Sequence, residues 1–156
     1  MKNIKRKGFT LVELLIVIVV IGILSAMMMM SSTEAVTSAK ASNIVSNMRN
    51  LKTAALAYYV DNLSSFDENV NLDISKDAVF NYLNGEQNIP EKASYNISND
   101  NGVWYISADI TGSTSEKERI RSKLQGRAKS VGLYDDKEGK NIYQGVNNYV
   151  ISIIRK

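Results

Sequence analysis

The sequence contains no cysteine and no histidine, and these two absences exclude several kinds of functional site. Without cysteine the chain has no disulfide framework, no thiolate nucleophile and no lipoprotein attachment point. Without histidine it lacks the commonest general base and the commonest transition-metal ligand. Neither a Ser-His-Asp nor a Cys-His site can therefore be built from this chain alone, and we expect a protein that is not an enzyme and binds no cofactor.

No net basic charge remains outside the first eight residues. The formal net charge is +3, with 19 basic and 16 acidic side chains. Four of the basic residues are Lys2, Lys5, Arg6 and Lys7, so their removal leaves 15 against 16 and a net charge of −1. The basic charge describes the beginning of the chain alone, and we do not expect a nucleic-acid partner.

An apolar run follows the basic residues and occupies positions 9–30. A helix of about 22 residues spans about 33 Å, which matches the hydrocarbon core of a bilayer. The basic flank stays inside by the positive-inside rule, so we expect a single-pass cytoplasmic membrane protein with its amino terminus in the cytoplasm. The run ends in Leu24-Ser25-Ala26 and four methionines, a poor match to the A-x-A cleavage site of an ordinary secretory signal.

One ionisable side chain, Glu13, lies inside the apolar run. Such a residue costs a few kcal/mol to insert and therefore needs a partner. A cut between Gly8 and Phe9 supplies one, because the new amino group at Phe9 of a neighbouring subunit can pair with Glu13 and set the axial register. The alternative is a plain membrane anchor that tolerates one glutamate near its cytoplasmic end by snorkelling.

Residues 7–13, KGFTLVE, resemble the class III signal sequence of type IV prepilins and pseudopilins. The motif combines a basic flank, a glycine, a phenylalanine, a nearby glutamate and an apolar run, and it ends near Met30. The resemblance implies that a prepilin peptidase and N-methyltransferase cleaves between Gly8 and Phe9 and methylates the Phe9 amine. It also implies that Glu13 serves assembly.

The resemblance further implies a structural subunit of a helical filament. An assembly ATPase and a platform protein would move the mature chain from the membrane into a filament of identical and related subunits at the cell surface. We expect a type IV pilus for adhesion, motility or DNA uptake. The alternative is a pseudopilin of a type II secretion system, and a remote alternative is a bitopic membrane anchor that never assembles.

One departure from the family pattern concerns residues 27–30, which are four methionines. Many members of the family carry a proline near Met30, whereas the only proline here is Pro90. Gly22 is the one intrinsic weak point of the run, because glycine lowers the stability of a helix by about 1 kcal/mol relative to alanine. Whether residues 22–30 melt on assembly is therefore left open by the sequence.

Beyond Met30 the apolar residues recur at helical spacing, at Ile44, Met48, Leu51, Ala55 and Tyr58. This stripe predicts one continuous helix from about Thr10 to about Asn62, apolar all round in its first half and amphipathic in its second. We expect three segments: a leader peptide over 1–8, a membrane or filament-core half-helix over 9–30, and a globular head domain over 31–156. The head domain includes the amphipathic half-helix 31–62.

Strand signals follow in the carboxyl-terminal half of the chain. Residues 93–98 alternate, 99–102 form a turn signal and 103–110 are rich in β-formers, which together predict a hairpin. Its face with Trp104, Ile106, Ala108 and Ile110 is expected to cover the long helix. A final strand over 146–154 should pair with this hairpin in an antiparallel sheet. The expected fold is α+β and pilin-like: a long amino-terminal helix packed by a small antiparallel sheet and one or two short helices.

The two short helices are predicted over 76–83 and 113–132. In the second, Ser115 is the expected N-cap with Glu118 completing a capping box. Its apolar stripe consists of Ile120, Leu124, Ala128 and Val131. Its other face carries a net charge of +4, for which plain surface, contact with the acidic segment 61–77 of a neighbouring subunit, and DNA binding are the alternatives.

Two acidic segments bear on metal binding. Segment 61–77 lacks the spacing of an EF-hand loop, and we interpret it as a solvated connection. The turn over 135–140 holds Asp135, Asp136 and Glu138, which are weak candidates for a calcium site. The expectation is that the chain binds no metal.

Overall fold

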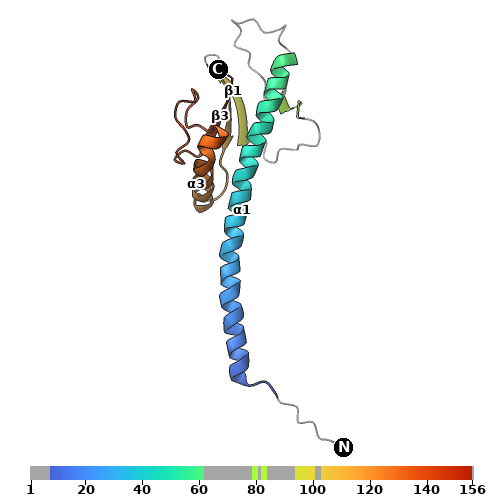
Figure 1. The fold of residues 1–156 in the computed structure, drawn as a ribbon, viewed down its shortest axis with the longest axis vertical. Helices are drawn as coiled ribbons and strands as arrows, with labels where there is room; N and C mark the ends of the chain where they lie inside the picture. The colour runs from blue at the N-terminus through green and yellow to red at the C-terminus, as the bar shows by residue number, and fades with distance from the viewer. Residues whose placement is uncertain (1–7, 62–78, 81, 84–93, 101–102, 156) are drawn as a thin grey trace, which may run out of the picture. The chain divides into compact units, whose positions relative to one another are not determined.

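The computed structural model describes residues 8–61, 79–80, 82–83, 94–100 and 103–155. The elements are, in order, α1 (Leu11–Asp61), β1 (Tyr95–Asp100), β2 (Val103–Asp109), α3 (Thr114–Val131) and β3 (Tyr149–Arg155) (Figure 1). This confirms the α+β layout of a long amino-terminal helix, a small antiparallel sheet and a second helix. The chain divides into two compact units, Met1–Val36 and Thr37–Lys156.

Helix α1 is continuous over 51 residues, as its pattern predicts, and ends at Asp61. No proline interrupts it, and Gly22 and the four methionines of residues 27–30 are all helical in the single chain. None of the side chains from Leu11 to Val36 is buried. In the described part of the chain, α1 is the one helix that is long and apolar enough to cross a membrane by length and composition.

The second unit is built on a three-stranded antiparallel sheet with the order β1-β2-β3. The register pairs Tyr95 with Ala108 and Asp100 with Val103, which confirms the predicted hairpin. Its turn residues 101–102 lie outside the described residues. Strand β3 pairs with β2 from Asp109↔Tyr149 onward, with an irregularity between Trp104 and Tyr105.

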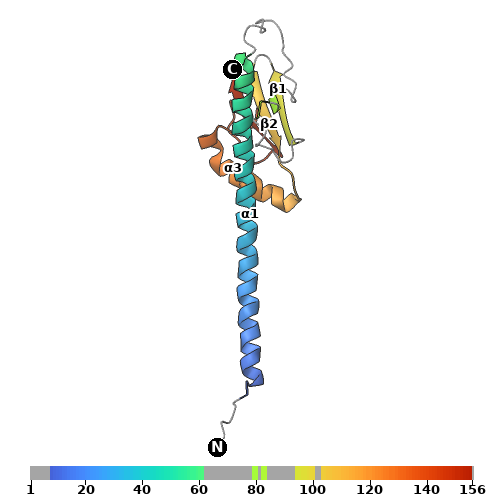
Figure 2. The ribbon, with the colours of Figure 1, turned by 90° about the vertical axis from the view of Figure 1, so that its right-hand side faces the viewer.

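The core of the second unit lies between the sheet and residues 37–61 of α1, and both views show the sheet alongside this part of the helix (Figures 1 and 2). The predicted inner face of β2 is confirmed, since Ile106 and Ala108 are fully buried. The helix contributes Met48, Leu51 and Ala55 to the same core. The alternation of the strand and the spacing of the helix therefore meet in one apolar layer.

Helix α3 packs its predicted stripe of Ile120, Leu124 and Ala128 into this core. The predicted N-cap is wrong: the cap residue is Ser113, and its side chain makes no capping hydrogen bond. At this earlier start the carboxylate of Glu116 accepts the Ser113 N–H and also binds Lys40 of α1. At the other end, Gly132 adopts φ 75°, a left-handed conformation that favours glycine, and its N–H bonds the Ala128 carbonyl.

Part of the predicted short helix over 76–83 is described. Val79 and Phe80 are helical and buried in the core, and the remainder of that helix, like most of segment 61–77, lies outside the described residues.

The packing of α3 generates a test of the core. Leu124→Ala should lower the free energy of unfolding by about 2–5 kcal/mol, because it removes a fully buried side chain and leaves a cavity. Gln125→Ala, one residue further on the exposed side of α3, should change it by less than about 0.5 kcal/mol. Urea unfolding of the full chain in detergent, followed by fluorescence of Trp104, measures both; equal effects would contradict the packing described.

Candidate functional site

The first turn of α1 holds Glu13 in a capping box. The Thr10 N–H and the Thr10 hydroxyl both donate to Oε2 of Glu13, each at 2.8 Å. In return, the Glu13 N–H donates to the Thr10 hydroxyl oxygen at 3.2 Å. The carboxylate and the Thr10 hydroxyl thus each satisfy one backbone donor at the helix start, and the carboxylate lies at the end of the helix that favours negative charge.

Only one of the two carboxylate oxygens of Glu13 is used in this way. Within the described residues, Oε1 accepts no hydrogen bond. The pairing with a neighbour's Phe9 amine, which the sequence predicts, is therefore compatible with the cap and stays a prediction. Thr10 is a residue that the sequence reading missed, although the spacing T-x-x-E is the signal for a capping box.

Gly8 and Phe9 lie immediately before this cap. Neither residue belongs to a helix or a strand, and the side chain of Phe9 is 81% exposed. The bond between them therefore lies outside α1, and both residues are exposed in the single chain. Cleavage at this bond and methylation of Phe9 remain predictions.

In the second unit, the loop that joins α3 to β3 is a further candidate site. Asp135 accepts hydrogen bonds from the Gln144 N–H and the Asn147 amide, and Asp136 accepts from the N–H groups of Lys140 and Asn141. The backbone of Tyr134 pairs with Ile151 of β3. These bonds fold the loop over the outer face of the sheet and hold it there.

The electrostatics of the loop follow from these bonds. Burial raises the pKa of Asp136, but the N–H groups of Lys140, Asn141 and Gly139 outweigh it and hold the pKa below its ordinary value. Burial raises the pKa of Tyr143 to about 12, and its hydroxyl donates to the Asn147 carbonyl at 2.7 Å. Tyr143 anchors the loop in the core, a role that the sequence pattern did not indicate.

The same bonds bear on the calcium candidates. Asp135 and Asp136 accept donors from their own loop, and Glu138 is paired with Lys140. Among the residues that the structure describes, no group of three or more acidic side chains is arranged to hold a metal ion. The calcium hypothesis gains no support from this geometry.

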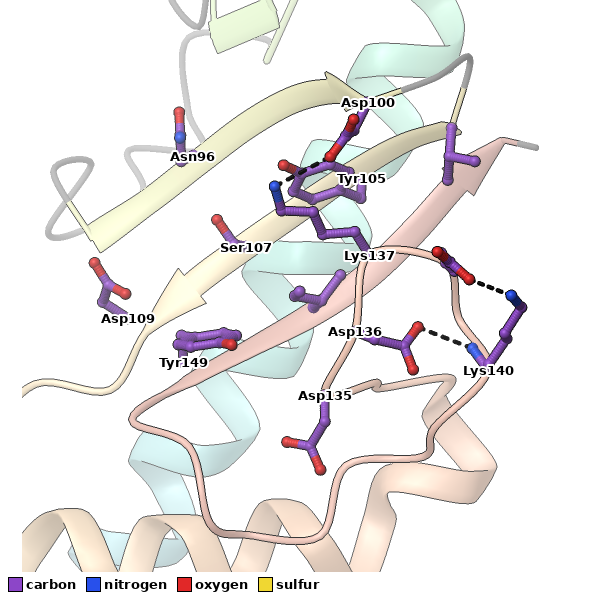
Figure 3. Close-up of a pocket in the computed structure, with 13 residues that line it drawn as sticks. Asn96, Asp100, Tyr105, Ser107, Asp109, Asp135, Asp136, Lys137, Lys140 and Tyr149 are labelled. Carbon is purple, nitrogen blue, oxygen red and sulfur yellow. Dashed lines mark hydrogen bonds and ion pairs between the residues drawn. The ribbon is translucent and has the colours of Figure 1, made fainter.

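A groove of about 940 Å³ lies between the loop and the outer face of the sheet (Figure 3). Tyr105 and Ile151 are buried in its floor, and Asp109 and Tyr149 stand at one end. Lys137 reaches across the floor to Asp100 of β1, with an N–O distance of 3.1 Å. Its ammonium group lies 5.6 Å from the centroid of the Tyr105 ring. The sequence reading missed this groove because the loop and the strands are far apart along the chain.

The basic helix α3 uses two of its cations within the second unit. Arg121 donates to the Val146 carbonyl and to the Asn148 side chain, and Arg127 donates to the Ser42 hydroxyl of α1 at 2.7 Å. These partners are uncharged, so the net charge of the helix is not neutralised by them.

The loop geometry predicts a dependence of stability on pH. The folded pKa of Asp136 is lowered, so its stabilising effect is complete above the ordinary pKa of 3.8 and is lost as the pH falls through the lower folded value. Asp136→Asn should therefore flatten the fall in unfolding free energy below about pH 4 and lower stability at neutral pH. Urea unfolding across pH 2–7 measures this, and parallel curves for the two proteins would refute it.

Comparison with known proteins is informative at the amino terminus. Residues 3–29 match the family model described as the prokaryotic N-terminal methylation motif. No curated protein and no solved structure matches the chain. The matched segment contains Gly8, Phe9 and Glu13 and the first part of α1, and it implies processing by a prepilin peptidase from a membrane-anchored precursor. The amino-terminal segment of the chain thus matches the class III signal sequence of type IV prepilins and pseudopilins.

Proposed function

We propose that this chain is a structural subunit of a type IV pilus-like surface filament and carries out no catalysis. The observation that supports this is the coincidence of two features at one place: the methylation motif over residues 3–29, and an apolar half-helix without a buried side chain. The motif marks a chain for processing and assembly, and the exposed helix supplies the surface on which assembly takes place.

The apolar half-helix needs a partner that the chain itself does not provide. Burial of one large apolar side chain stabilises by about 1.5–3 kcal/mol, and Leu11, Ile16, Val20 and Leu24 are each about half exposed or more. In the precursor, the bilayer surrounds these side chains. In the mature filament, the same half-helices of neighbouring subunits surround them.

Transfer from lipid to filament gains little from the hydrophobic effect, because lipid tails are as apolar as leucine side chains. Two consequences follow for the proposed filament. An assembly ATPase and a platform protein must supply work for extraction, and the specificity must come from packing and from polar groups in the apolar zone.

Glu13 is the polar group that fits this requirement. Its Oε2 atom is engaged by Thr10, and its Oε1 atom is open to a cation. Cleavage after Gly8 creates that cation at Phe9. Pairing between neighbours then compensates the desolvation of both charges and fixes the axial register of the subunits.

Mass spectrometry of the mature amino terminus tests the proposal. We expect N-methyl-phenylalanine at Phe9 in filaments sheared from the cell surface. An intact Met1 in cells that assemble filaments would overturn it. A mature chain that stays in the cell envelope, in a strain whose deletion mutant loses exoprotein secretion, would assign the chain to a secretion pseudopilus.

The role of Glu13 generates a further prediction. Glu13→Ala should leave cleavage intact and abolish filaments or make them heterogeneous, because the register pair is lost. Thr10→Ala is the matched control, since it removes the hydroxyl of the cap and keeps the carboxylate. Electron microscopy of surface filaments, with mass spectrometry of the amino terminus, compares the two. Normal filaments from Glu13→Ala would exclude the register role.

A further inference from the structure

The outer groove of the second unit carries an excess of negative charge. Its lining contains five acidic side chains and two lysines. Lys137 is paired with Asp100 and Lys140 with Glu138, so both lysines are already neutralised. The carboxylates of Asp109, Asp135 and Asp136 remain without an ionic partner among the described residues, which leaves the groove at −3.

Helix α3 carries the opposite excess. Glu116 and Glu118 oppose six cations, which gives +4, and Glu116 is paired with Lys40 of α1. The six cations form the basic face of α3: Lys117, Arg119, Arg121, Lys123, Arg127 and Lys129. Lys129 is exposed and Lys117 is partly exposed. Within the described part of the chain, no ion pair joins a cation of α3 to Asp109, Asp135 or Asp136.

The floor of the groove is suited to a lysine or arginine side chain. Lys137 of the loop already lies over the ring of Tyr105 at 5.6 Å, which is a cation–π distance. Tyr149 presents a second ring that is 40% exposed, at the end of the groove where Asp109 stands (Figure 3). Aromatic rings accept the alkyl stem and the charge of such side chains, and the carboxylates at the rim supply the counter-charge.

We propose that the acidic groove of one subunit binds the basic face of α3 of a second copy of this chain. The inference rests on the proposed function, since it names the partner surface of the head in the filament. Two grooves facing each other would repel, and so would two α3 helices, so the contact joins unlike surfaces. In the proposed filament each groove meets the helix of the next subunit, and such a head-to-tail contact that does not close generates a helical filament.

Cross-linking tests the contact, and the absence of cysteine makes the chain a clean background for it. Cells express two full-length chains together, one with Asp109→Cys and the other with Lys117→Cys or Lys129→Cys. The two α3 positions are about 18 Å apart along the helix and cover both of its ends. A short bis-maleimide then reports proximity, and peptide mass spectrometry identifies cross-links that join different chains.

We expect cross-linked peptides between position 109 and at least one α3 position. Arg49→Cys, at an exposed cation of α1 outside α3, is the matched control and should give no product with Asp109→Cys. A product from Lys117→Cys or Lys129→Cys with Asp67→Cys, and none with Asp109→Cys, would place α3 against the acidic segment 61–77 and overturn the inference.

Charge reversal provides the second readout. Asp109→Lys and the charge reversal of the α3 lysine that cross-links to position 109, Lys117→Glu or Lys129→Glu, should each lower the yield of surface filaments at least about threefold, and the two together should recover much of it. Arg49→Glu should leave the yield unchanged. The loss in the single variants should be smaller at about 1 M salt, where the Debye length falls to about 3 Å. Additive losses in the double variant would overturn the inference.

The inference and the proposed function fail in different ways. Filaments that begin at Phe9 and lack a 109–α3 cross-link would refute the groove contact and leave the pilin-like function standing. Cross-linked chains that retain Met1 and never form filaments would support the contact and refute the filament.

Discussion

The physical constraint on which this protein depends is an apolar half-helix that the described part of its own chain leaves uncovered. Burial along α1 begins at Thr37, so the side chains from Leu11 to Val36 must be surrounded by lipid or by other subunits. That need fits a membrane-anchored precursor, and in the proposed filament other subunits meet it. The remainder of the molecule solves the same problem internally: the sheet and α3 cover the second half of the helix.

Glu13 shows how one side chain serves two states. In the single chain it caps its own helix through Thr10, which satisfies backbone donors at the helix start. In the proposed filament its second oxygen receives the amine that cleavage creates. The cap also holds the carboxylate in one place before assembly, so less conformational entropy is lost when the intersubunit pair forms.

Many features of the fold were predictable because they are local or periodic. The length of α1, the hairpin of β1 and β2, and the stripe of Ile120, Leu124 and Ala128 follow from spacing alone, and the structure confirms them. The N-cap of α3 was predicted wrongly. Ser113 and Glu116 have the same S-x-x-E spacing as Ser115 and Glu118, so local rules allow both starts. In the structure Glu116 pairs with Lys40, which is distant in sequence, and the helix begins after Ser113.

By itself, the sequence determined the processing motif and the two-part helix, because a peptidase reads a short linear segment and helical periodicity needs no distant contact. Only the tertiary structure decided what surrounds the outer face of the sheet. The loop after α3 folds back through Tyr134 and Ile151, buries Tyr143 and forms the acidic groove with Tyr105 at its base. These residues meet through backbone pairing across the fold, and spacing along the chain carries no record of it.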